Sequence, residues 1–271
     1  MSSYNIKLQK MVRELRADID ATIVPLVKQY APEYVQDGTP SVDAVPATYT
    51  RDGWADAIQS ALSALLARWT SPLFRRAAGV IAGDFVRSSL SATDRRLKRT
   101  AGIDVFGSDN RLGEYIKAAT NQNARLIESV STQYLGQVAN IVEGNMRTGM
   151  RPSYIEKELT QQFGVTQRRA KMIARDQTAK VTGEINKQRQ VNAGFEYFRW
   201  RDSGDSRVRD RHHQIATAET PFGVGVYRWD DLPKSDKGEP IQPGSDYSCR
   251  CVAIAVSEAV VKRYQNSKKG R

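Results

Sequence analysis

The segment FEYFRW, residues 195–200, decides the fold because it marks where the pattern of the chain changes. An extended chain would bring Phe195, Tyr197 and Arg199 to one face and the three residues between and after them to the other. Before this segment, apolar residues recur at helical spacing. After it, Pro and Gly separate two further strand-like segments, at 226–229 and 250–256. The sequence therefore predicts a mostly α protein that ends in a small α+β domain, a compact few-stranded β module.

The region upstream of this segment is predicted to form long helices, because its apolar residues follow one another every three or four positions. Ser71-Pro72 is typical of a helix start, and Asp109 is an expected N-cap. The predicted helices cover 5–30, 54–69, the stretch from Pro72 to a break at 101–108, and 109–146. A linker rich in Pro is expected at 31–51. Downstream, a short helix is expected at 207–215 and a terminal helix from Ser257-Glu258.

A helical hairpin is predicted after the last long helix. A short first helix begins at a capping box formed by Ser153 and Glu156, and Gly164 ends it. Thr166 then caps a second helix that reaches about Asn192. The spacing suits a DNA-reading helix-turn-helix, but the second helix is too long for that motif. We therefore interpret the hairpin as a packing element.

Composition limits the class of protein. The chain has 271 residues, 40% of them hydrophobic, with a mean hydropathy of −0.54. We expect no membrane span and no secretory signal, since neither the interior nor the start has a long apolar run. Two cysteines provide no disulfide framework, which suits a reducing cytoplasm. The predicted division has four parts: 1–105 helical, 106–194 long helix plus hairpin, 195–257 α+β module, and 258–271 basic tail.

Positive charge is concentrated in two places. The net charge is +11, and residues 147–211 hold 15 Lys and Arg against 8 Asp and Glu, while 258–271 hold 5 against 1. Such a stripe and tail indicate either a non-specific nucleic-acid contact or a solubilising surface, and both interpretations stay open. The candidate contacts to nucleic acid are Arg168, Arg169, Lys171, Arg175, Lys180, Lys268 and Lys269.

The scarcest polar residues are grouped in two short segments. Both histidines are adjacent, at His212 and His213, and both cysteines lie in the tripeptide Cys249-Arg250-Cys251. We expect the two segments to meet in the fold. Residues His212, Cys249 and Cys251 would then supply three zinc ligands, with His213 or Asp205 as a fourth.

Other chemistry is open at the same place. Asp202, Asp205 and Asp210 would suit a nuclease-like site, and a Cys–His nucleophile from His212 and Cys251 is conceivable. The preferred interpretation is structural: arginines bond carboxylates or backbone, and the thiols fill core space. No third group is evident to orient a His–Cys pair. We therefore expect no enzyme and no obligatory cofactor, with zinc as the open exception.

Two sets of motifs carry a family resemblance. The first is Gly164-Val-Thr-x-x-Arg169-Ala-x-x-Ile173-Ala-Arg175-Asp-x-Thr178. The second comprises Trp200, Asp205-x-Arg207-x-Arg209-x-x-His212, Pro243-Gly244 and Cys249-Arg250-Cys251. Their order and spacing resemble the Mu F-like minor head proteins of tailed phages, a head-morphogenesis family, over about residues 110–256. One departure is Ile215-Ala-Thr217, where the family usually has a Gly.

The resemblance implies a structural role in a virion. Such a protein would act in head morphogenesis, in the host cytoplasm during assembly and later in the head interior or at the portal vertex. The implied partners are the portal protein, the major capsid protein or scaffold, and double-stranded DNA bound without sequence preference; no membrane is implied. The alternative is a metal- or thiol-dependent, nuclease-like enzyme that uses His212, Cys249 and Cys251.

Overall fold

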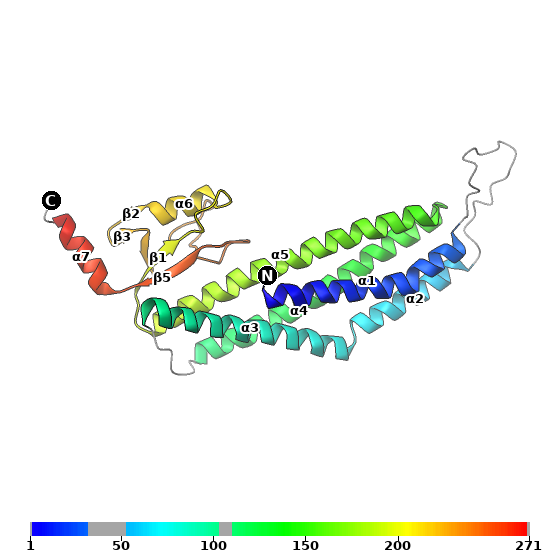
Figure 1. Cartoon of the computed structure of the whole chain (residues 1–271), viewed down its shortest axis with the longest axis horizontal. Helices are drawn as coiled ribbons and strands as arrows, with labels where there is room; N and C mark the ends of the chain where they lie inside the picture. The colour runs from blue at the N-terminus through cyan, green and yellow to red at the C-terminus, as the bar shows by residue number, and fades with distance from the viewer. Residues whose placement is uncertain (1, 32–52, 103–109, 270–271) are drawn as a thin grey trace. The chain divides into compact units, whose positions relative to one another are not determined.

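The computed structural model describes residues 2–31, 53–102 and 110–269 (Figure 1). It is mostly helical with a small antiparallel sheet near the C-terminus, as the sequence predicts. The helices are α1 (Ser3–Tyr30), α2 (Trp54–Trp69), α3 (Pro72–Ala101), α4 (Asn110–Arg147), α5 (Pro152–Asn192), α6 (Asp210–Thr217) and α7 (Glu258–Lys269). The strands are β1 (Tyr197–Arg201), β2 (Glu219–Thr220), β3 (Gly223–Val224), β4 (Val226–Arg228) and β5 (Val252–Val256). Within the described ranges, every helix is too short or too polar to traverse a bilayer.

The chain forms two compact units, of which the first comprises residues 1–82 and 121–174. Here α1 lies beside α2, and both bury one apolar stripe (Figure 1). The Trp69 indole donates to Asp18 of α1 at 2.8 Å, and the Tyr4 hydroxyl donates to Asn123 of α4 at 3.0 Å. The fully buried apolar residues of this unit include Leu8, Leu15, Ile19, Ile23, Ile58, Ile127, Met146, Ile155 and Leu159.

Several predicted helix ends are confirmed. The helix α3 begins at Pro72, and the Ser71 hydroxyl accepts a hydrogen bond from the Phe74 N–H at 3.1 Å, as an N-cap does. The bounds of α2 match the prediction, and those of α1 differ by two residues at its start. The expected Asp109 cap lies outside the described residues, as does nearly all of the linker at 31–51.

The predicted hairpin is wrong, because α5 runs without a break from Pro152 to Asn192. Ser153 lies inside the helix, whose first turn is closed by the Ile155 N–H donating to the Arg151 carbonyl. The Thr166 hydroxyl donates to the Gln162 carbonyl at 3.0 Å instead of capping a new helix. Residues 159, 166, 170 and 173 are all buried and form one helical stripe. Packing of this stripe therefore outweighs the turn preference of Gly164.

The second unit comprises residues 83–120 and 175–271. Its main sheet has the order β4-β1-β5 with both pairs antiparallel, and β2 pairs with β3. In β1 the side chains of Phe198 and Trp200 are buried while Arg199 and Arg201 are exposed, so the predicted alternation is confirmed. The sheet is held on α5 because Asn186 and Gln190 both donate to the carbonyl of Ala253, at 2.8 and 3.2 Å.

Two elements of this unit differ in extent from the prediction. Helix α6 begins at Asp210 and not at Arg207, because the Asp205 carboxylate accepts from the Arg207 N–H at 3.0 Å and Arg209 is extended. Strand β5 begins at Val252, so the two cysteines precede it. The terminal helix begins at Glu258 as predicted and continues to Lys269. The sequence-based division into four parts remains a prediction.

Candidate functional site

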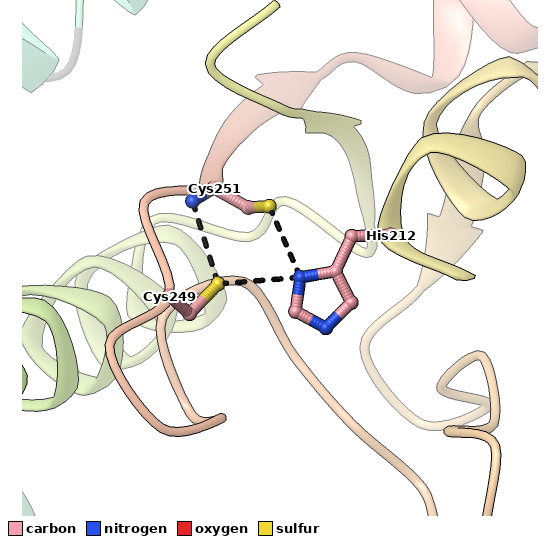
Figure 2. Close-up of side chains that lie close together, drawn as sticks. All are labelled: His212, Cys249 and Cys251. Carbon is pink, nitrogen blue, oxygen red and sulfur yellow. Dashed lines mark hydrogen bonds between the residues drawn. The ribbon is translucent and has the colours of Figure 1, made fainter. Parts of the chain in front are cut away.

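The two segments that hold the histidines and cysteines meet in the second unit. His212 lies in the first turn of α6, and Cys249 and Cys251 occupy the turn that leads into β5. The Nδ1 atom of His212 is 3.7 Å from the sulfur of Cys249 and 3.6 Å from the sulfur of Cys251 (Figure 2). The backbone N–H of Cys251 points at the sulfur of Cys249 over 3.4 Å. We call these three residues the His–Cys cluster.

The cluster is part of a hydrophobic core. His212 is 4% exposed, Cys249 3% and Cys251 7%, and both thiols are free. Trp200 of β1 packs edge-on against the His212 ring, with centroids 5.4 Å apart. Within the described residues, the Trp200 indole N–H is buried without a hydrogen-bond partner. Solvent therefore reaches these polar atoms poorly.

Asp246 supplies the orienting group that the sequence did not reveal. One of its carboxylate oxygens is 3.3 Å from the Nε2 atom of His212, on the side of the ring away from the sulfurs. The N–H of Cys249 donates to the backbone carbonyl of Asp246, which ties the carboxylate to the cysteine turn. Asp246 lies three residues before Cys249 in a segment rich in turn residues, and this proximity was the only signal available in the sequence.

The members of the cluster shift one another's pKa values. Hydrogen bonding from Cys251 is the largest influence on Cys249 and lowers its pKa, with His212 acting in the same direction and burial against it. The same contact with Cys249, together with burial, raises the pKa of Cys251. The contact with Cys249 raises the pKa of His212, although burial opposes it. The two thiols therefore shift each other's pKa in opposite directions.

A network of ion pairs surrounds the cluster. The Arg250 guanidinium makes two hydrogen bonds to Asp205, which also accepts from the side chain of Arg207 at 3.3 Å. These contacts, that of Arg250 first, lower the pKa of Asp205. Arg209 donates to the carbonyl of Tyr247 at 2.7 Å and pairs with Asp246 at 3.3 Å. The arginines thus pair with carboxylates and backbone, as the structural interpretation expected.

Neither expected fourth zinc ligand belongs to the cluster. His213 is exposed, and its Nδ1 atom is 2.9 Å from Asp202. Asp205 is engaged by the arginines. Of the carboxylates considered for a nuclease-like site, Asp202 and Asp205 have different partners. Among the described residues, Asp202, Asp205 and Asp210 do not form a group that could hold a metal ion.

The cysteine turn is anchored on α5 by close backbone contact. A Cβ added at Gly183 would lie 2.6 Å from the carbonyl oxygen of Pro243, and one at Gly244 would lie 2.7 Å from the carbonyl of Ala179. Gly244 also has a φ of 92°, which side chains rarely adopt. The Ser248 N–H donates to Asp176 of α5 at 2.9 Å. These contacts explain why Pro243-Gly244 occurs together with the Cys-x-Cys motif.

The seven candidate contacts to nucleic acid divide into two groups. Arg168, Lys171, Arg175 and Lys269 have exposed side chains. The other three have partners within the protein: Arg169 donates to Ser129, Lys180 pairs with Asp176, and Lys268 pairs with Glu219. The sequence shows where the positive charges are, but it does not show which of these side chains have partners within the protein.

Comparison with known proteins finds a family that resembles the segment carrying this geometry. The family described as Phage Mu protein F like protein matches residues 136–254, which contain the His–Cys cluster and its anchoring contacts. The resemblance to the Mu F-like proteins is confirmed over this segment.

One curated relative extends the comparison. An uncharacterized protein of Haemophilus influenzae is 32% identical over 172 residues, which cover 61% of this chain and 36% of the relative. The chain thus spans about a third of the length of the relative it matches. No solved structure matches the chain.

Proposed function

We propose that this chain is a minor component of a tailed-phage head, which acts in head morphogenesis near the portal vertex and contacts packaged DNA without reading its sequence. The observation that carries the proposal is the Mu F-like match over residues 136–254. The motif residues of that segment serve packing and anchoring, which supports a role in assembly. The expected partners are the portal protein and either the major capsid protein or the scaffold.

The place of action follows from this role. The chain would be made in the host cytoplasm, join the head during assembly, and remain in the head interior or at the portal vertex. Co-expression with the portal protein of the same phage tests the partner directly. Co-elution at a fixed ratio supports the proposal, whereas complete separation at low and moderate salt contradicts it.

Non-specific DNA contact is supported by the exposed cations on α5. Arg168, Lys171 and Arg175 follow one another at helical spacings of three and four, so they point to the same side of the helix. Phosphate contacts of this kind release counterions, and the logarithm of the binding constant falls by about 0.9 per contact for each tenfold rise in salt. Affinity should therefore depend steeply on salt and little on sequence.

A charge-matched pair of variants tests the DNA contact. The first replaces Arg168, Lys171 and Arg175 by Gln, and the second replaces three exposed cations that have acidic partners, Lys10, Arg87 and Lys262. Both lose three positive charges. We expect only the first to lose DNA affinity and to reduce the salt slope by up to about 3. Equal losses in both would show that net charge alone attracts DNA, and no loss in the first would remove α5 from the contact.

The enzymatic alternative receives one new observation, because Asp246 orients His212 as the third member of a Cys–His–Asp arrangement. Access argues against it. Both sulfurs are buried, and the surface hollow beside α6 is lined by residues such as Arg211, Tyr227 and Lys234 and by no member of the cluster. A nucleophilic cysteine must be accessible to its substrate. The burial of both sulfurs therefore supports a structural role of the His–Cys cluster better than a catalytic one.

A further inference from the structure

We propose that the His–Cys cluster is a structural zinc site, in which Nδ1 of His212 and the sulfurs of Cys249 and Cys251 bind one ion. This inference goes beyond the role in the phage head and does not depend on it. Among the described residues, these three side chains form a group whose donor atoms lie within 4.8 Å of one another. No further His, Cys, Asp or Glu of the described ranges joins them, so a water molecule would hold the fourth position. Such a position is open to substrates in catalytic zinc sites, but the burial of all three protein ligands assigns this ion a structural role.

The first argument is that two sulfurs approach one nitrogen. An imidazole nitrogen that is not protonated has a single lone pair, so it accepts one hydrogen bond. Yet both sulfurs lie at nearly equal distances from Nδ1 of His212, 3.7 and 3.6 Å. A single proton on Nδ1 or on one thiol can bridge only two of these three atoms. A cation between them would accept a lone pair from all three.

The second argument is the position of Asp246. Its carboxylate lies 3.3 Å from Nε2, so that nitrogen is inferred to carry the proton and to donate it. The other nitrogen, Nδ1, then presents its lone pair to the two sulfurs. A carboxylate that accepts from the far nitrogen of a metal-binding histidine is a frequent arrangement in zinc sites, because it fixes the tautomer and the ring orientation.

The third argument is distance. With a zinc–sulfur bond of about 2.3 Å and a zinc–nitrogen bond of about 2.0–2.1 Å, a tetrahedral site requires about 3.6 Å between nitrogen and sulfur. The two distances in the structure agree with that edge. The two nitrogen–sulfur edges therefore already have the spacing that the ion requires.

The fourth argument is the surroundings. Zinc binds cysteine as the thiolate, and its own positive charge would offset the cost of holding two thiolates in this hydrophobic core. Arg209 pairs with the orienting Asp246, and the Cys251 N–H already points at the Cys249 sulfur. The buried Trp200 N–H, which has no partner among the described residues, is a further donor available beside the site. Donors of this kind stabilise metal-bound sulfur.

The site would also have a clear structural effect. The zinc ion would link α6 to the turn before β5. His212 and Cys249 are 37 residues apart in the sequence, and beyond α6 the chain between them forms only the short strands β2, β3 and β4. The three strands of this sheet have at most five residues each, so the sheet alone buries a small core. Small modules of this type often gain their stability from a bound metal.

The experiment uses the full chain, purified in reducing buffer without chelator. Elemental analysis is expected to find about one zinc ion per chain. Cys249→Ser and Cys251→Ser should each remove most of it, and His213→Ala, which changes the neighbouring exposed histidine, should keep it. Wild-type protein that holds no zinc, or a His213→Ala variant that loses as much as the cysteine variants, would overturn the assignment.

A second measurement covers the case in which a cysteine variant does not fold. Cobalt(II) added to the reduced, metal-free wild-type chain should give the absorption bands of tetrahedral thiolate ligation, saturating at about one equivalent, and zinc should abolish them. In parallel, both thiols should react with a thiol reagent only after a chelator is added. Free reactivity of both thiols in untreated protein, or cobalt bands of octahedral ligation, would contradict the site. Neither result bears on incorporation into phage heads, so the two proposals fail separately.

Discussion

Asp205 holds the loop between β1 and α6 in place. It accepts from the backbone and side chain of Arg207 and from the guanidinium of Arg250, a residue of the Cys-x-Cys turn. One carboxylate thus joins both halves of the second family motif. Because these contacts stabilise its ionised form, the pKa of Asp205 lies below the ordinary aspartate value.

The lowered pKa of Asp205 predicts a pH dependence of stability. A carboxylate whose pKa is depressed by folding stabilises the protein above its unfolded pKa of about 3.9, and this contribution is lost as the pH falls toward the folded pKa. Asp205→Asn should therefore be less stable than wild type at pH 7, and the difference should shrink below about pH 4.

Urea denaturation at several pH values measures this difference. Asp236→Asn, which changes an exposed aspartate, is the control and should follow the wild type throughout. A difference between Asp205→Asn and wild type that stays constant from pH 7 to pH 3 would show that charge does not stabilise the loop.

The sequence predicts some contacts of the His–Cys cluster and not others. That His212 meets Cys249 and Cys251 follows from the scarcity of these residue types, and the distances confirm it. Asp246 could not be selected in the same way, because it is one of many acidic residues and only the turn of the chain brings it to Nε2. The ion pairs of Lys180 with Asp176 and of Lys268 with Glu219 could not be predicted for the same reason.

At the scale of elements, the continuity of α5 is the clearest difference from expectation. Glycine is common where helices end, but it also fits inside a helix when the flanking residues pack on one stripe. Leu159 and Ala170 are fully buried on either side of Gly164, so tertiary packing decides its conformation. The start of α3 was readable because it depends on a local capping residue, Ser71.

Gly164→Ala tests the continuous helix. A Cβ at this position would meet only the end of the Arg168 side chain at 3.5 Å, an ordinary contact. Alanine is the better helix former, so the free energy of unfolding should rise by about 0.5–1 kcal/mol. A left-handed turn at Gly164 would instead make the variant less stable by about 1–2 kcal/mol, which chemical denaturation distinguishes by sign.

The contact between α5 and the Pro243-Gly244 turn gives a second prediction for this helix. Gly183→Ala would place a methyl group 2.6 Å from the carbonyl oxygen of Pro243, and backbone cannot move aside easily. We expect destabilisation of about 1–3 kcal/mol. Gly136→Ala in α4 is the matched control, because it has open space and should stabilise by about 0.5–1 kcal/mol. A stabilised Gly183→Ala would rule out the close approach.

At the scale of the whole molecule, the more basic of the two charged segments, residues 147–211, lies inside the segment that matches the Mu F-like family. The net charge of +11 is carried mainly by residues 147–211 and 258–271, and exposed cations remain on α5 after the internal ion pairs are set aside. The Mu F-like match covers 136–254. Fold class and the Mu F-like resemblance could both be inferred from the sequence, because they depend on periodicity and motif spacing. The division into two compact units could not, since it depends on long-range packing.

The most direct test of the central claim is quantitative mass spectrometry of procapsids and mature phage particles, both purified from cells whose genome encodes this chain. We expect the chain in the particles, at a small and fixed ratio to the portal protein. Absence from both kinds of particle, while the portal protein is detected, would contradict a role as a head component.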